Sequence, residues 1–122
     1  MIFHRGAYKH IIFTTNGAES LKTAEDHVPP NRKACIAQLR RLLKQLGDRG
    51  SLRSPDQCRN EGNDIYAIKA NCGLRAYGWF DHDENTDTSL FVVGLCVLKK
   101  KQKMDQSDRN QVIREREQFR ED

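Results

Sequence analysis

The sequence predicts a single α+β domain in which an antiparallel β-meander packs with an N-terminal strand and a helical hairpin on one face, in the order β-α-α-β-β-β-α. Three observations lead to this prediction. A short β-branched run is followed by two stretches with the apolar spacing of helices, the middle of the chain alternates around a tight turn, and a polar helix-forming stretch ends the chain. With 122 residues, the chain is long enough for one modest core.

The first strand is expected over residues 10–15, His-Ile-Ile-Phe-Thr-Thr, because these residues are mostly β-branched or aromatic. The Asn16-Gly17 pair then signals a turn. A short helix is expected over Ala18–Asp26. The Pro29-Pro30 pair would end it, because proline lacks the backbone donor that a helix needs.

The second helix is expected to begin after Asn31, a favourable N-cap, and to end at Gly47. Apolar residues recur along it at intervals of three, four and three, which gives one apolar stripe: Ile36, Leu39, Leu43 and Leu46. From residue 31 to residue 53 there are seven Lys and Arg against one Asp. Two of these cations, Arg40 and Lys44, are candidates for RNA binding, because a basic helix attracts a phosphate backbone.

Residues 64–80 predict a β-hairpin whose loop is Asn71-Cys72-Gly73. This register places Lys69 opposite Arg75 on one face, beside Tyr77 and Trp79. Two cations that face each other weaken a sheet, so the pair fits a site for an anionic ligand. The alternative is a pair of solvated strand residues that extend past one another. The layout leaves this face as an open surface, on which the two aromatic side chains could stack on bases. The alternative for Tyr77 and Trp79 is ordinary packing against the C-terminal helix. The other face is almost entirely apolar and carries Tyr66, Ile68, Ala70, Leu74, Ala76, Gly78 and Phe80.

A polar connection, Ser51–Asn63, is expected to precede the hairpin. The last strand, Leu90–Leu98, is apolar on both faces, as in a strand covered on both sides. Asp105 can cap a C-terminal helix at about residues 105–120, whose few apolar residues predict weak docking. Between strand and helix, the segment from Leu98 to Lys103 holds four lysines.

The net charge is +4 and the pI is near 9, values that fit nucleic-acid binding without requiring it. The four cysteines have no Cys-x-x-Cys spacing, so neither a metal site nor another cofactor is expected. Cys35 and Cys96 are expected to be buried core residues. The sequence has no signal-peptide pattern and no apolar stretch of about 18 residues, which predicts a cytoplasmic protein with reduced thiols and no membrane contact.

Three segments carry a resemblance to a known family. They are Ile-Tyr-Ala-Ile-Lys at 65–69, Gly-Leu-Arg-Ala-Tyr-Gly-Trp-Phe at 73–80, and Val-Val-Gly-Leu-Cys-Val-Leu-Lys-Lys-Lys-Gln-Lys at 92–103. In this order, followed by a polar helix, they resemble the RelE/HigB-type toxins of bacterial type II toxin–antitoxin systems, including the phage-derived branch of the RelE/ParE superfamily. The resemblance covers most of the chain in element order, but only these segments in residue detail.

The resemblance implies a RelE-like fold and a prokaryotic toxin that cuts mRNA in the ribosomal A site, with a cognate antitoxin as its partner. Arg75 falls on the arginine that holds the scissile phosphate, and Lys69 on a lysine of the active site. The further catalytic cation would be Lys99, Lys100 or Lys101. Contacts to RNA would come from Lys101, Lys103, Tyr77 and Trp79.

Cleavage without a metal requires the 2′-hydroxyl to attack the neighbouring phosphate. Arg75 can bind two phosphate oxygens, and Lys69, whose pKa should be lowered by the Arg75 charge, can act as the base. A lysine of the 99–103 cluster can supply positive charge or the final proton. His10 and His82 are more typical of capping or surface residues.

Two other functions remain open. A ParE-like toxin would bind DNA gyrase through its helical hairpin without nuclease activity, and the incomplete acid–base set favours this alternative. A non-catalytic module would bind nucleic acid or protein. The Lys69–Arg75 pair and the lysine cluster favour the ribonuclease.

Overall fold

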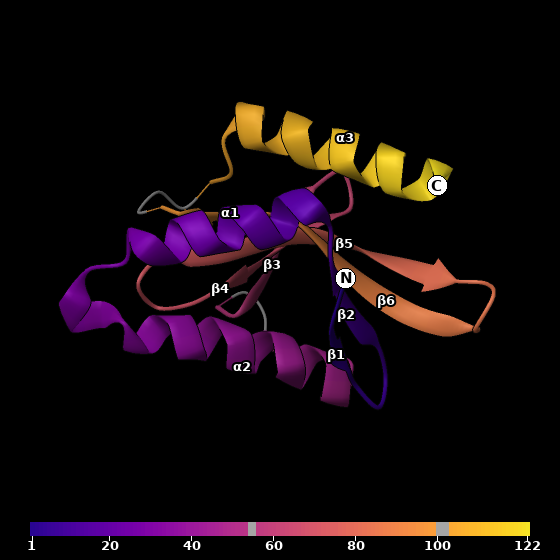
Figure 1. Ribbon diagram of the computed structural model, residues 1–122, viewed down its shortest axis with the longest axis horizontal. Helices are drawn as coiled ribbons and strands as arrows, with labels where there is room; N and C mark the ends of the chain where they lie inside the picture. The colour runs from indigo at the N-terminus through magenta and orange to yellow at the C-terminus, as the bar shows by residue number, and fades with distance from the viewer. Residues whose placement is uncertain (54–55, 100–102) are drawn as a thin grey trace.

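The computed structural model describes residues 1–53, 56–99 and 103–122. Within these ranges it is a mixed α+β fold with a six-stranded sheet and three α-helices (Figure 1). The elements are β1 (Ile2–Arg5), β2 (His10–Phe13), α1 (Thr15–Asp26), the short 3-10 helix η1 (Pro30–Arg32), α2 (Ala34–Arg49), β3 (Cys58–Gly62), β4 (Ile65–Lys69), β5 (Leu74–Asp83), β6 (Thr88–Leu98) and α3 (Gln106–Glu121). The predicted α+β class is confirmed, but the predicted element order lacks two strands.

The sheet has the strand order β1-β2-β6-β5-β4-β3. Neighbouring strands are antiparallel, except that β2 runs parallel to β6. The antiparallel meander is therefore confirmed for β4, β5 and β6, whereas the N-terminal strand joins it in parallel. The apolar strand β6 lies in the middle of the sheet, as its sequence predicted.

Two hydrophobic cores lie on the two faces of the sheet. On one face, α1 and α2 bury apolar side chains such as Leu21, Leu39 and Leu43 against β2, β4, β5 and β6. On the other face, α3 buries Val112. Figure 1 shows α2 and α3 on opposite sides of the sheet.

The β4–β5 hairpin has the predicted register. Lys69 pairs with Arg75, and Ala67 pairs with Tyr77. Gly73 has a φ of 95°, and a Cβ atom there would lie 2.0 Å from the carbonyl oxygen of Lys99. Glycine is therefore required at this position by both backbone conformation and close packing.

Several predicted boundaries are wrong. Thr14, whose hydroxyl accepts a bond of 3.0 Å from the Gly17 amide, caps α1, so this helix begins before Ala18. Asn31 lies in η1 and does not cap α2. Helix α2 continues through Gly47 and ends before Gly50, which has a φ of 83°.

Two of the four cysteines form a disulfide, Cys35–Cys72, so the expectation of reduced thiols is wrong for this pair. Cys58 and Cys96 are free. Cys35 and Cys96 are buried, as predicted. None of the helices in the described ranges is long and apolar enough to cross a membrane.

Helix α3 makes more contacts than its sequence indicated. Arg109 donates to the Glu61 carbonyl at 2.6 Å, and Arg116 donates to the Asn63 carbonyl at 2.6 Å. The Thr14 hydroxyl donates to Glu115 at 2.6 Å. These contacts connect α3 to the β3–β4 hairpin and to the N-terminus of α1.

Candidate anion-binding site

A cleft of about 370 Å³ opens at the end of the β4–β5 hairpin. It is lined by Arg32, Lys69, Ala70, Asn71, Cys72, Gly73, Arg75 and Lys99. We call it the cationic cleft, because four of these side chains are Lys or Arg and none of the described lining residues is acidic. Such a surface favours an anionic ligand, since fixed positive charges reinforce one another's field at its mouth.

Three segments of the chain bring these cations together. Lys69 and Arg75 face each other across the hairpin. Lys99 follows β6, and its amide donates to the Gly73 carbonyl at 3.0 Å. Arg32 comes from η1 and reaches the Asn71 carbonyl at 3.5 Å.

Lys69 is the partly exposed cation of the hairpin pair. Its pKa is lowered by burial first, and then by the charges of Arg75 and Arg59. The expected direction of the shift is therefore confirmed, although burial rather than Arg75 is its main cause. A lowered pKa increases the fraction of Lys69 whose amine is neutral at a given pH, and a general base must be in this neutral form.

Arg75 is only 4% exposed, so its expected place on an open surface is wrong. Burial raises the pKa of the neighbouring Tyr77, and the nearby guanidinium of Arg75 partly opposes this shift. Arg75 therefore contributes to the cleft mainly through its charge, and a bidentate grip on a phosphate would require it to become more exposed.

Lys99 lies between the cleft and the start of α3. Its amine forms ion pairs with Asp105 and, at 2.7 Å, with Asp108. Burial lowers the pKa of Lys99, but the hydrogen bonds and charges of the two carboxylates outweigh burial and raise it. Lys99 is thus positively charged at neutral pH.

The proposed stacking aromatics are not on an open surface. Tyr77 is 0% exposed and Trp79 is 1% exposed, because α3 covers this face of the sheet. The Trp79 indole packs edge-on against Phe119, with 5.9 Å between ring centroids, and its nitrogen donates to Asp81 at 3.1 Å. In this conformation neither ring can stack on a base.

The other predicted residues do not gather at the cleft. Arg40 and Lys44 lie on α2, and Arg40 is paired with Glu25 at 2.7 Å. Lys103 is exposed just before α3. His82 pairs with Asp87 at 2.9 Å, at the far hairpin tip. Lys100 and Lys101 lie outside the described residues.

Sequence reasoning missed Arg32 and the polar loop residue Asn71. The Asn71 amide donates to the Gln38 side chain of α2 at 2.8 Å, and this contact helps to hold the loop against the helix. No local pattern marks Arg32, because its position depends on how η1 and α2 pack against a loop that is distant in sequence.

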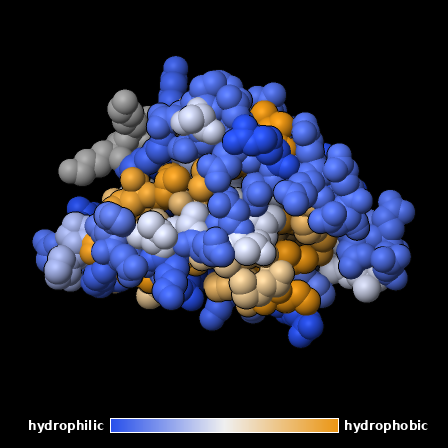
Figure 2. Space-filling view, turned by 45° about the horizontal axis from the view of Figure 1, so that its top comes forward, coloured by the Kyte–Doolittle hydropathy of each residue, from blue (hydrophilic) through white to orange (hydrophobic). Residues whose placement is uncertain are grey.

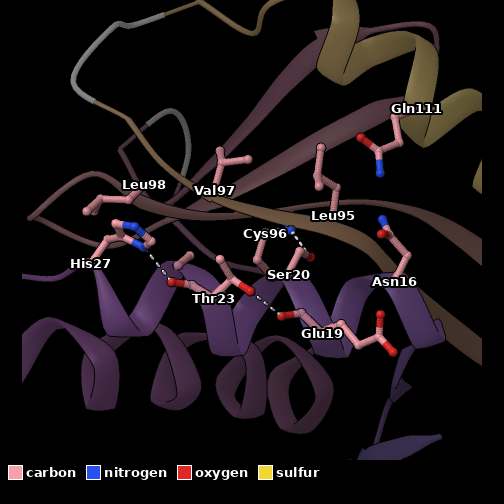
Figure 3. Close-up of a pocket in the computed structure, with 11 residues that line it drawn as sticks. Asn16, Glu19, Ser20, Thr23, His27, Leu95, Cys96, Val97, Leu98 and Gln111 are labelled. Atoms are coloured by element: carbon pink, nitrogen blue, oxygen red, sulfur yellow. Dashed lines mark hydrogen bonds between the residues drawn. The ribbon is translucent and has the colours of Figure 1, made fainter.

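A larger groove of about 780 Å³ lies between α1 and α3, above the second half of β6 (Figure 3). Two of its polar side chains are engaged with the sheet: Ser20 accepts from the Cys96 amide at 2.8 Å, and Asn16 donates to the Gly94 carbonyl at 2.8 Å. Figure 2 shows hydrophobic surface exposed among mostly hydrophilic residues. We favour the cationic cleft as the functional site, because four Lys and Arg side chains line it.

The described residues contain no group of three or more His, Cys, Asp or Glu that could hold a metal ion. Comparison with protein-family models, curated proteins and solved structures finds no match to this chain.

Proposed function

We propose that this protein binds RNA at the cationic cleft and acts as a ribosome-dependent mRNA endonuclease, a toxin of the RelE/HigB type. The observation that carries the proposal is the convergence of Arg32, Lys69, Arg75 and Lys99 on one cleft without an acidic neighbour among its described lining residues. RNA phosphates are the polyanions that such a cleft suits, since Arg and Lys bind phosphate oxygens through charge-assisted hydrogen bonds.

In the proposed mechanism, Lys69 removes the proton from the 2′-hydroxyl, in keeping with its lowered pKa. The 2′-oxygen then forms a bond to the neighbouring phosphorus, the bond from phosphorus to the 5′-oxygen breaks, and the leaving 5′-oxygen takes a proton from water. Lys99 stays protonated and stabilises the negative charge that develops on the phosphate. The buried positive charge of Arg75 adds to the electrostatic attraction for the phosphate. Arg32 binds a neighbouring phosphate from the exposed side of the cleft.

The proposal includes a strong dependence on the ribosome. The cleft has no histidine or carboxylate among its described lining residues, so its own acid–base capacity is limited to amines. Positioning of the mRNA by a translating ribosome would then supply much of the rate, because orientation alone lowers barriers substantially. Cytoplasmic action and neutralisation by an antitoxin belong to the same proposal.

The test is to induce the chain in bacterial cells and to map new 5′ ends on mRNA. We expect growth arrest and new ends within translated regions. The Lys69→Ala variant should lose both effects, whereas Lys44→Ala, on the outer side of α2, should retain them. Growth arrest without new mRNA ends would refute the nuclease proposal.

A second candidate is a nucleic-acid-binding module without nuclease activity. Two observations favour it: Arg75 is buried, and Lys99 is engaged by two carboxylates. This alternative predicts RNA binding in vitro with no new mRNA ends in cells.

A further inference from the structure

The Cys35–Cys72 disulfide joins the start of α2 to the hairpin loop that lines the cationic cleft. The two cysteines are 37 residues apart in sequence. Cys72 is partly exposed, whereas Cys35 is buried. A reductant would therefore reach the bond from the side of the cleft.

The disulfide is the one covalent link between this loop and the helical layer among the described residues. Ala70, Cys72 and Leu74 also pack in or against the core that contains the apolar face of α2. At exposed positions the loop has two hydrogen bonds to the helical layer, from Arg32 to the Asn71 carbonyl and from the Asn71 amide to Gln38. Single hydrogen bonds at exposed positions contribute little to stability, because water competes for the same groups. Loss of the disulfide should therefore loosen the contact between the loop tip and the start of α2, while Ala70 and Leu74 stay packed in the core.

Arg32 is the cation that depends most directly on this link. It lies in η1, three residues before Cys35, and it is the lining cation that does not belong to the β4–β6 part of the sheet. When the loop tip and the start of α2 loosen, Lys69 and Arg75 stay paired on β4 and β5, and Lys99 stays bonded to the Gly73 carbonyl. Arg32 then no longer has a fixed position beside these three cations.

We propose that the Cys35–Cys72 disulfide is a redox-sensitive control of anion binding: the oxidised protein holds Arg32 at the cleft, and reduction lowers affinity for RNA phosphate. This inference rests on the proposed function of the cleft. It also fits the proposed cytoplasmic action, because disulfides in that compartment are mostly transient and redox-sensing.

The chemistry requires a dithiol reductant. One thiolate attacks the Cys72 sulfur, the bond to Cys35 breaks and a mixed disulfide forms. The second thiol of the reductant then displaces Cys72. Two electrons and two protons pass to the protein, which gains two thiols, while the reductant becomes a disulfide.

The test measures the anisotropy of a fluorescein-labelled single-stranded RNA with oxidised protein and with protein reduced by dithiothreitol. We expect reduction to lower affinity by about tenfold, the loss of one charge-assisted contact. In the Arg32→Ala variant, the oxidised protein should already have this lower affinity, and reduction should change it no further. Cys58→Ser retains the disulfide and should behave as the unmodified protein does.

The possible failures are distinguishable. Equal affinity of the oxidised and reduced proteins would overturn the redox control while leaving RNA binding intact. A further loss on reduction of Arg32→Ala would show that the disulfide does not act through Arg32. Absence of binding in both states would refute the proposed function and this inference with it. Loss of the far-ultraviolet circular dichroism signal on reduction would also overturn the inference, because the bond would then support the whole fold.

Discussion

Replacement of Val112 by alanine should destabilise the protein strongly, although the sequence of α3 indicated weak docking. Val112 is 0% exposed and lies in the core that α3 forms with Ile65, Tyr77 and Trp79. The substitution removes two buried carbon atoms, worth about 1.6 kcal/mol in transfer free energy. Because a packed site collapses only partly, the cavity adds to this cost, and we expect a loss of about 2–3 kcal/mol in the free energy of unfolding.

The assay is urea denaturation followed by the fluorescence of Trp79, the single tryptophan of the chain. The matched control is Arg114→Ala, two residues away on the exposed side of the same helix, which should change stability by less than about 0.5 kcal/mol. A loss below about 0.5 kcal/mol for Val112→Ala as well would mean that α3 does not cover this face of the sheet in solution.

Three further predictions concern buried and charged groups. The emission of Trp79 should be blue-shifted and poorly quenched by acrylamide, since the ring is 1% exposed; emission typical of tryptophan in water would refute this burial. Arg75→Ala should lower the free energy of unfolding by roughly 2 kcal/mol, because it leaves a cavity at a buried position. An unchanged stability in urea denaturation would mean that the Arg75 side chain is exposed. The folded-state pKa of Lys99 is raised above its ordinary value of 10.5, so its contribution to stability is complete below that pH and is lost as the pH rises through the folded pKa. The stability difference between the unmodified protein and Lys99→Gln should therefore shrink in alkaline solution, and a difference that grows there would contradict the Asp105 and Asp108 ion pairs.

The parts of the fold that sequence reasoning predicted are those with strong local patterns. Alternation around Asn71–Gly73 is sufficient for the hairpin register, because side chains on a strand point to opposite faces in turn. The apolar run of β6 predicted a strand covered on both sides. Strands β1 and β3 were missed because they are short, lie at the two edges of the sheet and, in the case of Cys58–Gly62, are mostly polar.

The site was harder to predict, because it depends on contacts between distant segments. The Lys69–Arg75 pair follows from the hairpin alone. The disulfide does not, since four cysteines allow several pairings and only the packing of α2 brings Cys35 and Cys72 together. The burial of Tyr77 and Trp79 depends on where α3 docks, and its few apolar residues are a weak local signal.

The central claim, that the cationic cleft binds RNA phosphate, is tested most directly by the affinity of the oxidised protein for single-stranded RNA at several salt concentrations. We predict that binding weakens as salt rises and that Lys69→Glu lowers affinity by at least about tenfold. The charge-matched control Lys44→Glu, on α2, should stay within about twofold of the unmodified protein. Equal losses for the two variants would show non-specific attraction to a basic protein, and affinity unchanged by Lys69→Glu would contradict the assignment of the cleft.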